Sequence, residues 1–280
     1  MNIPKKLINR IRSEYSPSEM NNFRKWQIDA LNNQTISLNA DIYNCPECKN
    51  AGIIYYPSEN GVEYAAECSC MPIRRMLENA HKNGLGTYIN KTFDDYIATE
   101  AWQIGIKQKA AEFVRDKSDA WFTITGQSGA GKTLICSIIA RELMFEQKKD
   151  VYYLTWTDFI GKVKRALMSD TAKEASKEIE KAKQTEVLFI DELLKIYTSA
   201  DLKYLIEIIN YRYTKRLKTI ITSELSTQEL CDIDEATFGR MIEMSNQKGY
   251  YIFIAKDRSK NQRLSSIRNF GEYAPTLPTV

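Results

Sequence analysis

This sequence is poor in histidine, glycine and proline, and it lacks any long apolar stretch. Its 280 residues include one histidine, 12 glycines and 7 prolines, with 43% apolar and 27% charged residues. That balance is typical of a globular protein rather than of a low-complexity chain. No apolar run approaches the ~20 residues that a membrane-spanning helix needs. The basic opening MNIPKKLINRIR is followed by neither a long apolar segment nor a small-residue cleavage site, so we expect a cytoplasmic protein without a membrane partner.

A strong charge of one sign is also missing. The net charge of +3 is too small to indicate a nucleic-acid-binding protein by itself. Basic residues do gather locally, in the cluster of Arg212, Lys215, Arg216 and Lys218 and in the segment 256–268. Each cluster is compatible with a solvated surface as well as with a binding patch.

A phosphate-binding loop lies near the middle of the chain. The stretch GQSGAGKT fits the pattern G-x-x-x-x-G-K-[ST] without mismatch, after the apolar run 121–125 and before a helical pattern. Backbone N–H groups of such a loop, together with the positive end of the helix, surround phosphate oxygens. Lys132 is expected to reach the β- and γ-phosphates of ATP, and Thr133 to offer a hydroxyl to Mg²⁺. The nucleotide-binding residues are therefore predicted to be Gly126, Gln127, Ser128, Gly129, Ala130, Gly131, Lys132 and Thr133.

A second apolar run ends in two acids. The segment VLFI, residues 187–190, has the length of a buried strand, and Asp191 and Glu192 follow at its carboxyl end, where open α/β sheets bind ligands. Asp191 is predicted to hold Mg²⁺, through water, and Glu192 to polarise the water that attacks the γ-phosphate. The alternative for Glu192 is a helix-capping acid.

Apolar runs of strand length alternate with helical patterns from about residue 98 onward. This alternation predicts an α/β fold with a five-stranded parallel sheet and crossover helices. The expected strands are 121–125, 151–155, 187–190, 219–222 and 250–255. The expected helices are 98–115, 132–147, 158–168, 171–183 and 199–215, with 227–244 mostly helical.

Four of the six cysteines form two close pairs. Cys45 and Cys48 enclose Pro-Glu, and Cys68 and Cys70 enclose Ser69; a hairpin pattern with an Asn60-Gly61 turn separates the pairs. Such an arrangement brings four thiolates into the tetrahedron that structural Zn²⁺ accepts, which leaves no open position for zinc catalysis. Free thiols or a redox pair are the alternatives. His81 is expected to have a surface or packing role rather than to be a ligand.

The phosphate loop, the VLFIDELLK segment and the TIITSELS segment resemble the AAA+ ATPases, and within them the helicase loaders of the DnaC/DnaI type and the IstB-like ATP-binding proteins. The resemblance covers about residues 90–265. It implies that Ser223, or its neighbour Thr222, senses the γ-phosphate. It implies that Arg240 is an arginine finger acting on a neighbouring subunit, with a helix-surface arginine as the alternative. It further implies that Arg263, with Arg258 in reserve, is the second sensor.

The resemblance also implies the domain organisation and the partners. Residues 1–75 would bind a hexameric DnaB-type replicative helicase and contain the zinc module at about 41–72, as a small zinc-ribbon-like domain. The residues themselves predict a linker at 76–97, which contains Gly84, Gly86 and Asn90. The resemblance implies an AAA+ ATPase domain at 98–280. Single-stranded DNA would be contacted by Lys162, Lys164 and Arg165, which alternatively form a solvated helix face.

The leading hypothesis is therefore an ATPase that loads a replicative helicase during phage or bacterial DNA replication and acts as an oligomer. An IstB-like regulator of DNA transposition is the first alternative. A kinase of a small metabolite is disfavoured by the Asp191-Glu192 pair, since a kinase substrate supplies its own attacking oxygen. A zinc adaptor without catalysis is disfavoured because Lys132, Thr133 and both acids are intact.

Overall fold

The computed structural model describes residues 17–33, 44–56, 64–82, 86, 88–168 and 172–264. The chain divides into two compact units, Met1–Arg75 and Met76–Val280, which are considered separately below. None of the helices in these described ranges combines the length and the apolar character that crossing a bilayer requires.

The described part of the first unit contains a helix, two antiparallel strands, the cysteine cluster and the start of α3 (Met71–Lys82). Helix α2 (Pro17–Asn32) precedes the antiparallel strands β1 (Ile53–Tyr56) and β2 (Tyr64–Glu67). The side-chain amide of Asn32 pairs with the backbone of Tyr55, donating to its carbonyl at 3.1 Å and accepting from its N–H at 2.9 Å. The end of α2 thereby occupies the free hydrogen-bonding edge of β1. The predicted Asn60-Gly61 turn lies outside the described residues.

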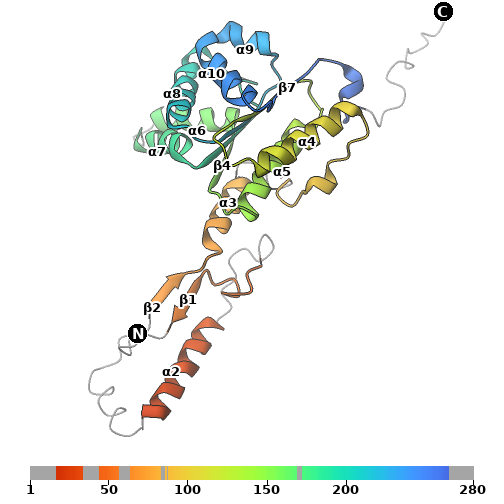
Figure 1. Ribbon diagram of the computed structural model, residues 1–280. Coiled ribbons are helices and arrows are strands. Elements are labelled where there is room, and N and C mark those ends of the chain that lie inside the picture. Colours follow the sequence, from red (N-terminus) through yellow and green to blue (C-terminus); the bar gives the residue numbers. More distant parts are fainter. Residues whose placement is uncertain are drawn as a thin grey trace, which may run out of the picture. The chain divides into compact units, whose positions relative to one another are not determined.

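The second unit is built on a five-stranded parallel sheet (Figure 1). Its strands lie in the order β4-β5-β6-β3-β7. The strands are β3 (Phe122–Gly126), β4 (Val151–Thr155), β5 (Val187–Asp191), β6 (Thr219–Thr222) and β7 (Tyr251–Ile254). All five strands match the predicted segments within about a residue. Because the strands are parallel, their carboxyl ends share one edge, where Thr155 pairs with Asp191.

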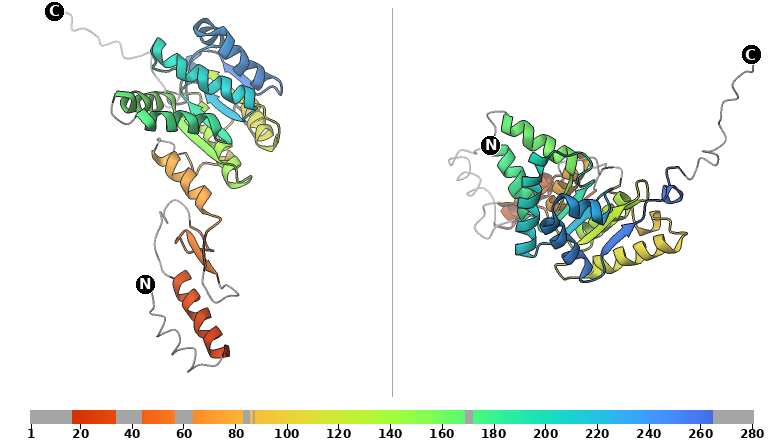
Figure 2. Two further views of the ribbon diagram at one scale, coloured as in Figure 1. Left: turned by 90° about the vertical axis from the view of Figure 1, so that its left-hand side faces the viewer. Right: turned by 90° about the horizontal axis from the view of Figure 1, so that it is seen from above.

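Helices cover both faces of this sheet, with α4 and α5 packed together on one face and α7, α8 and α10 on the other (Figure 2). The helices are α3 (Met71–Lys82), α4 (Ala101–Arg115), α5 (Lys132–Phe145), α6 (Trp156–Met168), α7 (Ala172–Gln184), α8 (Ser199–Lys215), α9 (Thr227–Ile233) and α10 (Glu235–Asn246). Two short 3-10 helices, η1 (Phe93–Asp95) and η2 (Arg258–Lys260), complete the regular elements of the described chain.

Side-chain caps explain where the helix boundaries differ from the sequence patterns. The Gln103 side chain accepts the N–H groups of Thr99 and Glu100, both at 2.9 Å, so α4 begins at Ala101 rather than at residue 98. The helical stretch expected over 227–244 is divided at Asp234, whose extended backbone and side-chain bond to the Thr237 N–H start α10.

The segment 76–97, expected to be a linker, contains part of α3 and all of η1. Its residues Ile89 and Tyr96 are buried in the second unit. The core of this unit is formed by apolar residues of the central strands and the helices around them, including Trp121, Trp156, Phe189 and Phe238. This rigid sheet fixes the positions of the loops at its carboxyl edge.

Candidate nucleotide-binding site

The phosphate loop connects β3 to α5 in a conformation that excludes larger residues at two of its glycines. Gly126 has φ +99°, and a Cβ there would lie 2.0 Å from the carbonyl oxygen of Ile254. Gly129 has φ +73°, and a Cβ there would lie 2.1 Å from Oδ1 of Asn261. The loop is therefore held against the last residue of β7 and the segment that follows it, and both positions require glycine.

Lys132 begins α5 and is 93% shielded from solvent, with 7% of its surface exposed. Its ammonium donates to the carbonyls of Gly126 and Gln127 at 2.8 and 2.7 Å. Desolvation by burial lowers its pKa, and the carboxylates of Glu224 and Asp191 oppose that shift. A triphosphate placed in the loop would supply the negative charge that this buried cation lacks.

Asp191 ends β5 and is the centre of a hydroxyl cluster. One carboxylate oxygen accepts from Thr133 at 3.0 Å and from Thr222, and the other accepts from Tyr153 at 3.1 Å. Burial raises the pKa of Asp191, although these three hydrogen bonds act in the opposite direction. An oxygen-rich group with a buried carboxylate and a loop hydroxyl fits Mg²⁺, which prefers hard oxygen ligands.

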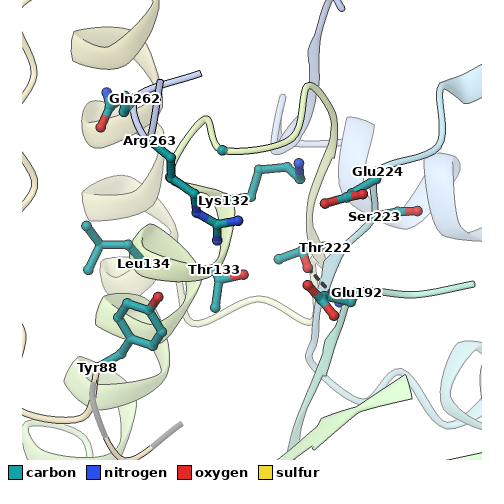
Figure 3. A pocket seen from close by; sticks show the side chains of 12 residues that line it. Tyr88, Lys132, Thr133, Leu134, Glu192, Thr222, Ser223, Glu224, Gln262 and Arg263 are labelled. Carbon is teal, nitrogen blue, oxygen red and sulfur yellow. Dashed lines mark hydrogen bonds between the residues drawn. The ribbon is translucent and has the colours of Figure 1, made fainter. Parts of the chain in front are cut away.

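The two candidates for γ-phosphate sensing point in different directions (Figure 3). The Thr222 hydroxyl bonds Asp191 and accepts the backbone N–H of Glu192 at 2.9 Å. The Ser223 hydroxyl instead donates to the carbonyl of Leu193 at 2.8 Å. Both residues line the cavity. Only the Thr222 hydroxyl contacts the Asp191 carboxylate.

A cavity of about 250 Å³ joins these groups. Its lining residues include Tyr88, Gly129, Gly131, Lys132, Thr133, Leu134, Glu192, Thr222, Ser223, Glu224, Gln262 and Arg263. Arg263 reaches into the cavity toward Thr133 (Figure 3). The backbone N–H of Gln262 donates to the Gly129 carbonyl at 3.0 Å, which holds the segment after β7 on the phosphate loop.

Arg240 does not line this cavity. It lies on α10, where its guanidinium donates to Oδ1 of Asn210 at 2.7 Å and stands over the ring of Tyr213. Its position leaves open the predicted role in a neighbouring subunit's site.

The three candidate DNA-contacting residues are divided between two faces of α6. Lys162 and Arg165 line a groove of about 670 Å³ between α6 and α7, together with Lys177 and with the acids Glu174 and Glu178. The ammonium of Lys164 lies 2.7 Å from the carboxylate of Asp201, whose side chain is 2% exposed. Lys164 therefore compensates a buried charge at the start of α8.

The first unit has a separate candidate metal site. The Sγ atoms of Cys45, Cys48, Cys68 and Cys70 all lie within 4.8 Å of one another, and all four residues are buried. Two of the sulfur pairs are 3.8 and 3.6 Å apart. Zn–S bonds of about 2.3 Å in a tetrahedron place sulfur atoms about 3.8 Å apart, so the donor set fits Zn²⁺.

Sequence reasoning missed several residues of these sites. Tyr153 contacts Asp191 from the neighbouring strand, and Glu224 accepts from the Ser128 hydroxyl at 2.8 Å. Arg74 is buried beside the cysteine cluster and donates to Sγ of Cys70 at 3.4 Å. Tyr153 and Glu224 act through contacts 38 and 96 residues away, which no local pattern specifies, although Glu224 lies within the TIITSELS segment. Arg74 is only four residues from Cys70, and the basic residue one helical turn after the cysteine is the signal that could have found it.

The parallel sheet, the phosphate loop and the acid pair at the same edge define an α/β nucleotide-binding protein of the AAA+ type. Comparison with known proteins shows the family. The sequence profile of the IstB-like ATP-binding proteins matches residues 75–238, and the chain belongs to this family.

Two relatives from Bacillus subtilis (strain 168) match most of the chain. The phage-like element PBSX protein XkdC is 26% identical over 89% of this chain and 97% of its own length. The protein YqaM is 23% identical over 82% of this chain and 89% of its own length.

Two solved structures share the fold. The DnaC helicase loader superposes with a TM-score of 0.52 at 22% identity, over 61% of this chain and 99% of its own. A putative primosome component from Streptococcus pyogenes serotype M3 gives 0.51 at 20% identity, over 62% and 91%. The predicted α/β fold and the resemblance to DnaC-type and IstB-like proteins are thereby confirmed.

Proposed function

We propose that this chain is an ATP-dependent loader of a hexameric DnaB-type replicative helicase that acts on single-stranded DNA during replication. The observation that carries the proposal is the meeting of Lys132, Thr133 and Glu192 at one cavity, in a fold shared with the DnaC helicase loader. Asp191 lies directly behind the cavity wall, where its carboxylate accepts from the Thr133 hydroxyl at 3.0 Å. The unit that contains the four cysteines supports a second binding function. We propose that this unit binds the helicase.

The residues have distinct roles in the proposed hydrolysis of ATP. The loop N–H groups and Lys132 hold the phosphates, and Thr133 and Asp191 hold Mg²⁺, which screens the phosphate charge when bound. Glu192 orients the attacking water and accepts its proton. Thr222, with Ser223 beside it, fixes the acids in relation to the γ-phosphate, and Arg263 contributes charge from the opposite wall.

Hydrolysis and binding can be tested separately on the full chain. Lys132→Ala should abolish binding of a fluorescent ATP analogue. Glu192→Gln should retain binding and lose ~10²-fold or more in turnover, since it removes the general base. A wild-type chain that binds no ATP, alone or with helicase and DNA, would contradict the proposed function.

The role of Arg240 in trans has a specific test. Arg240→Ala and Glu192→Gln proteins should each be nearly inactive in hydrolysis. Mixed in equal amounts, they should regain part of the activity, because some sites then combine an intact Glu192 with a neighbour's intact Arg240. No recovery on mixing, in a preparation that forms oligomers, would assign Arg240 to a structural role.

The partner can be tested by size-exclusion chromatography of the full chain with a purified hexameric replicative helicase. We expect a complex with the wild-type chain that is lost in Cys70→Ser. Absence of a complex in ATP, ADP and nucleotide-free buffer, together with binding of a transposase, would favour an IstB-like regulator of transposition instead.

Binding to DNA is proposed to involve the groove between α6 and α7. Replacing Lys162 and Arg165 by alanine should weaken binding of a labelled single strand and reduce the salt dependence. Lys164→Ala should mainly lower stability, because it leaves Asp201 buried without its ion pair. Equal losses of affinity in both variants would contradict this division of roles.

A further inference from the structure

A row of charged side chains lies beside the nucleotide cavity, in which Glu192 and Glu224 line the cavity and Lys195 contacts both from outside its lining. The ammonium of Lys195 lies 2.7 Å from the carboxylate of Glu192 and 4.0 Å from that of Glu224. Glu224 in turn accepts from the hydroxyl of Ser128 in the phosphate loop at 2.8 Å. These contacts therefore link Glu192, the candidate catalytic acid, to the loop that would hold the γ-phosphate.

The backbone holds Lys195 in this place. Glu192 and Leu194 both have positive φ, +54° and +57°, which is uncommon for residues with a side chain. The Lys195 N–H donates to the Glu192 carbonyl at 3.1 Å, and the N–H of Leu193 donates to the backbone carbonyl of Thr222 at 2.8 Å. A tight turn tied to β6 thus brings the lysine back toward the acid three residues before it.

The two acids of this row of side chains would repel a bound triphosphate. Two carboxylates, Glu192 and Glu224, lie at the end of the cavity where a γ-phosphate would bring further negative charge. Lys195 is the cation between them, and the hydrogen bond to Glu192 raises its pKa, which keeps it charged at neutral pH. Its side chain is 40% exposed and so has room to turn.

We propose that Lys195 is a positioning residue that exchanges its partner when ATP binds. Without a γ-phosphate its ammonium holds Glu192 and screens Glu224. With a γ-phosphate it turns to the phosphate oxygens, and Glu192 is released to orient water. The inference rests on the proposed ATP hydrolysis and adds to it a residue that distinguishes ATP from ADP.

The test compares the affinities of ATP and ADP for the full chain. Lys195→Ala should weaken ATP about tenfold, the loss expected for one charge-assisted hydrogen bond, and change the ADP affinity less than about twofold. Lys195→Arg should restore most of the preference for ATP. The matched control is Lys109→Ala, which removes a Lys–Glu pair of similar exposure and 2.9 Å separation on α4.

A second set of variants tests the exchange itself. Glu192→Gln frees Lys195 from its ion pair, so it should bind ATP more tightly than the wild type while its ADP affinity is unchanged. The loss caused by Lys195→Ala should then be larger in the Glu192→Gln background than in the wild type.

Three results would contradict the inference, and they differ in what they imply for the proposed function. An unchanged ratio of ATP to ADP affinity in Lys195→Ala would overturn the inference and leave the proposed function intact. Equal effects of Lys195→Ala in both backgrounds would reduce Lys195 to a general attractive charge and overturn the exchange. A wild-type chain without ATP binding would overturn both the inference and the proposed function.

Discussion

The backbone N–H of Glu192 donates to the Thr222 hydroxyl at 2.9 Å, so the last residue of β6 fixes the start of the loop after β5. The same hydroxyl bonds Asp191, the last residue of β5. One side chain therefore contacts the carboxylate of Asp191 and the backbone of Glu192. Since the two strands are neighbours in the sheet, this contact follows from the strand order.

This contact predicts that Thr222 contributes more to hydrolysis than Ser223. Thr222→Ala should lower turnover about tenfold further than Ser223→Ala, because it removes a hydrogen bond to the Asp191 carboxylate and one from the Glu192 backbone. The Ser223 hydroxyl bonds only backbone groups of Leu193 and Leu225, at 2.8 and 3.2 Å. Steady-state ATPase rates check this, with Thr222→Ser expected to retain most activity. Equal losses in the two alanine variants would contradict the assignment.

Arg212 should be a stability residue rather than part of a basic surface. It is fully buried, and its guanidinium donates to the Thr219 hydroxyl and to carbonyls of Ala182, Lys183, Thr185 and Lys218. Arg212→Met would leave these acceptors unpaired, and it should lower the free energy of unfolding by about 3 kcal/mol or more. Urea denaturation measures this loss, and the exposed Lys215→Met on the same helix serves as the control. A loss below about 1 kcal/mol would show that water replaces the guanidinium.

Lys218 should make stability depend on pH in the alkaline range. Desolvation by burial lowers the pKa of Lys218 to about 8, whereas in the unfolded chain it returns to about 10.4. Between these values the unfolded chain binds more protons at this site, so the stability of the folded state rises with pH. Lys218→Met, neutral throughout, should lack this rise.

Urea denaturation of both proteins at pH 7.5 and 9.5 measures the difference. The stability of the wild type relative to Lys218→Met should be greater at pH 9.5. An unchanged difference would mean that the Lys218 ammonium is solvated or that its contacts with the Asp116 carbonyl and the Phe113 ring compensate for its burial.

The cysteine cluster should bind one zinc ion per chain and lose stability without it. Removal of zinc with a strong chelator should open the first unit to proteolysis, because a module of this size has little core of its own. Cys70→Ser should lower the zinc content in the same way. Cys136→Ala replaces a buried cysteine outside the cluster and should keep the full metal content, as measured by elemental analysis.

Much of the fold was predictable because its signals are local. The strand segments 151–155 and 219–222 and the helix 199–215 have the observed boundaries. Their apolar periodicities, bounded by polar and helix-starting residues, are complete within a few turns of chain. The phosphate loop was predictable for the same reason, since all eight residues are consecutive.

The roles of the basic residues were not predictable from the sequence. Arg212, Lys215, Arg216 and Lys218 are close together in sequence and suggest one surface patch, yet Arg212 is buried and Lys218 is half-buried. Lys164 differs from Lys162 and Arg165 only through Asp201, which lies 37 residues away. A charged side chain has the same local signature whether it meets water or a distant carboxylate.

The sequence by itself determined the class of this protein: a phosphate loop after a strand, an acid pair after a second strand, and two cysteine pairs around a hairpin. Tertiary structure alone decided which side chains meet, namely Thr222 with both acids and Glu224 with Ser128 of the phosphate loop. The physical reason is that local patterns specify backbone conformation and burial. Contacts across 30 to 100 residues arise only when the strands adopt the order β4-β5-β6-β3-β7 and bring their carboxyl ends together.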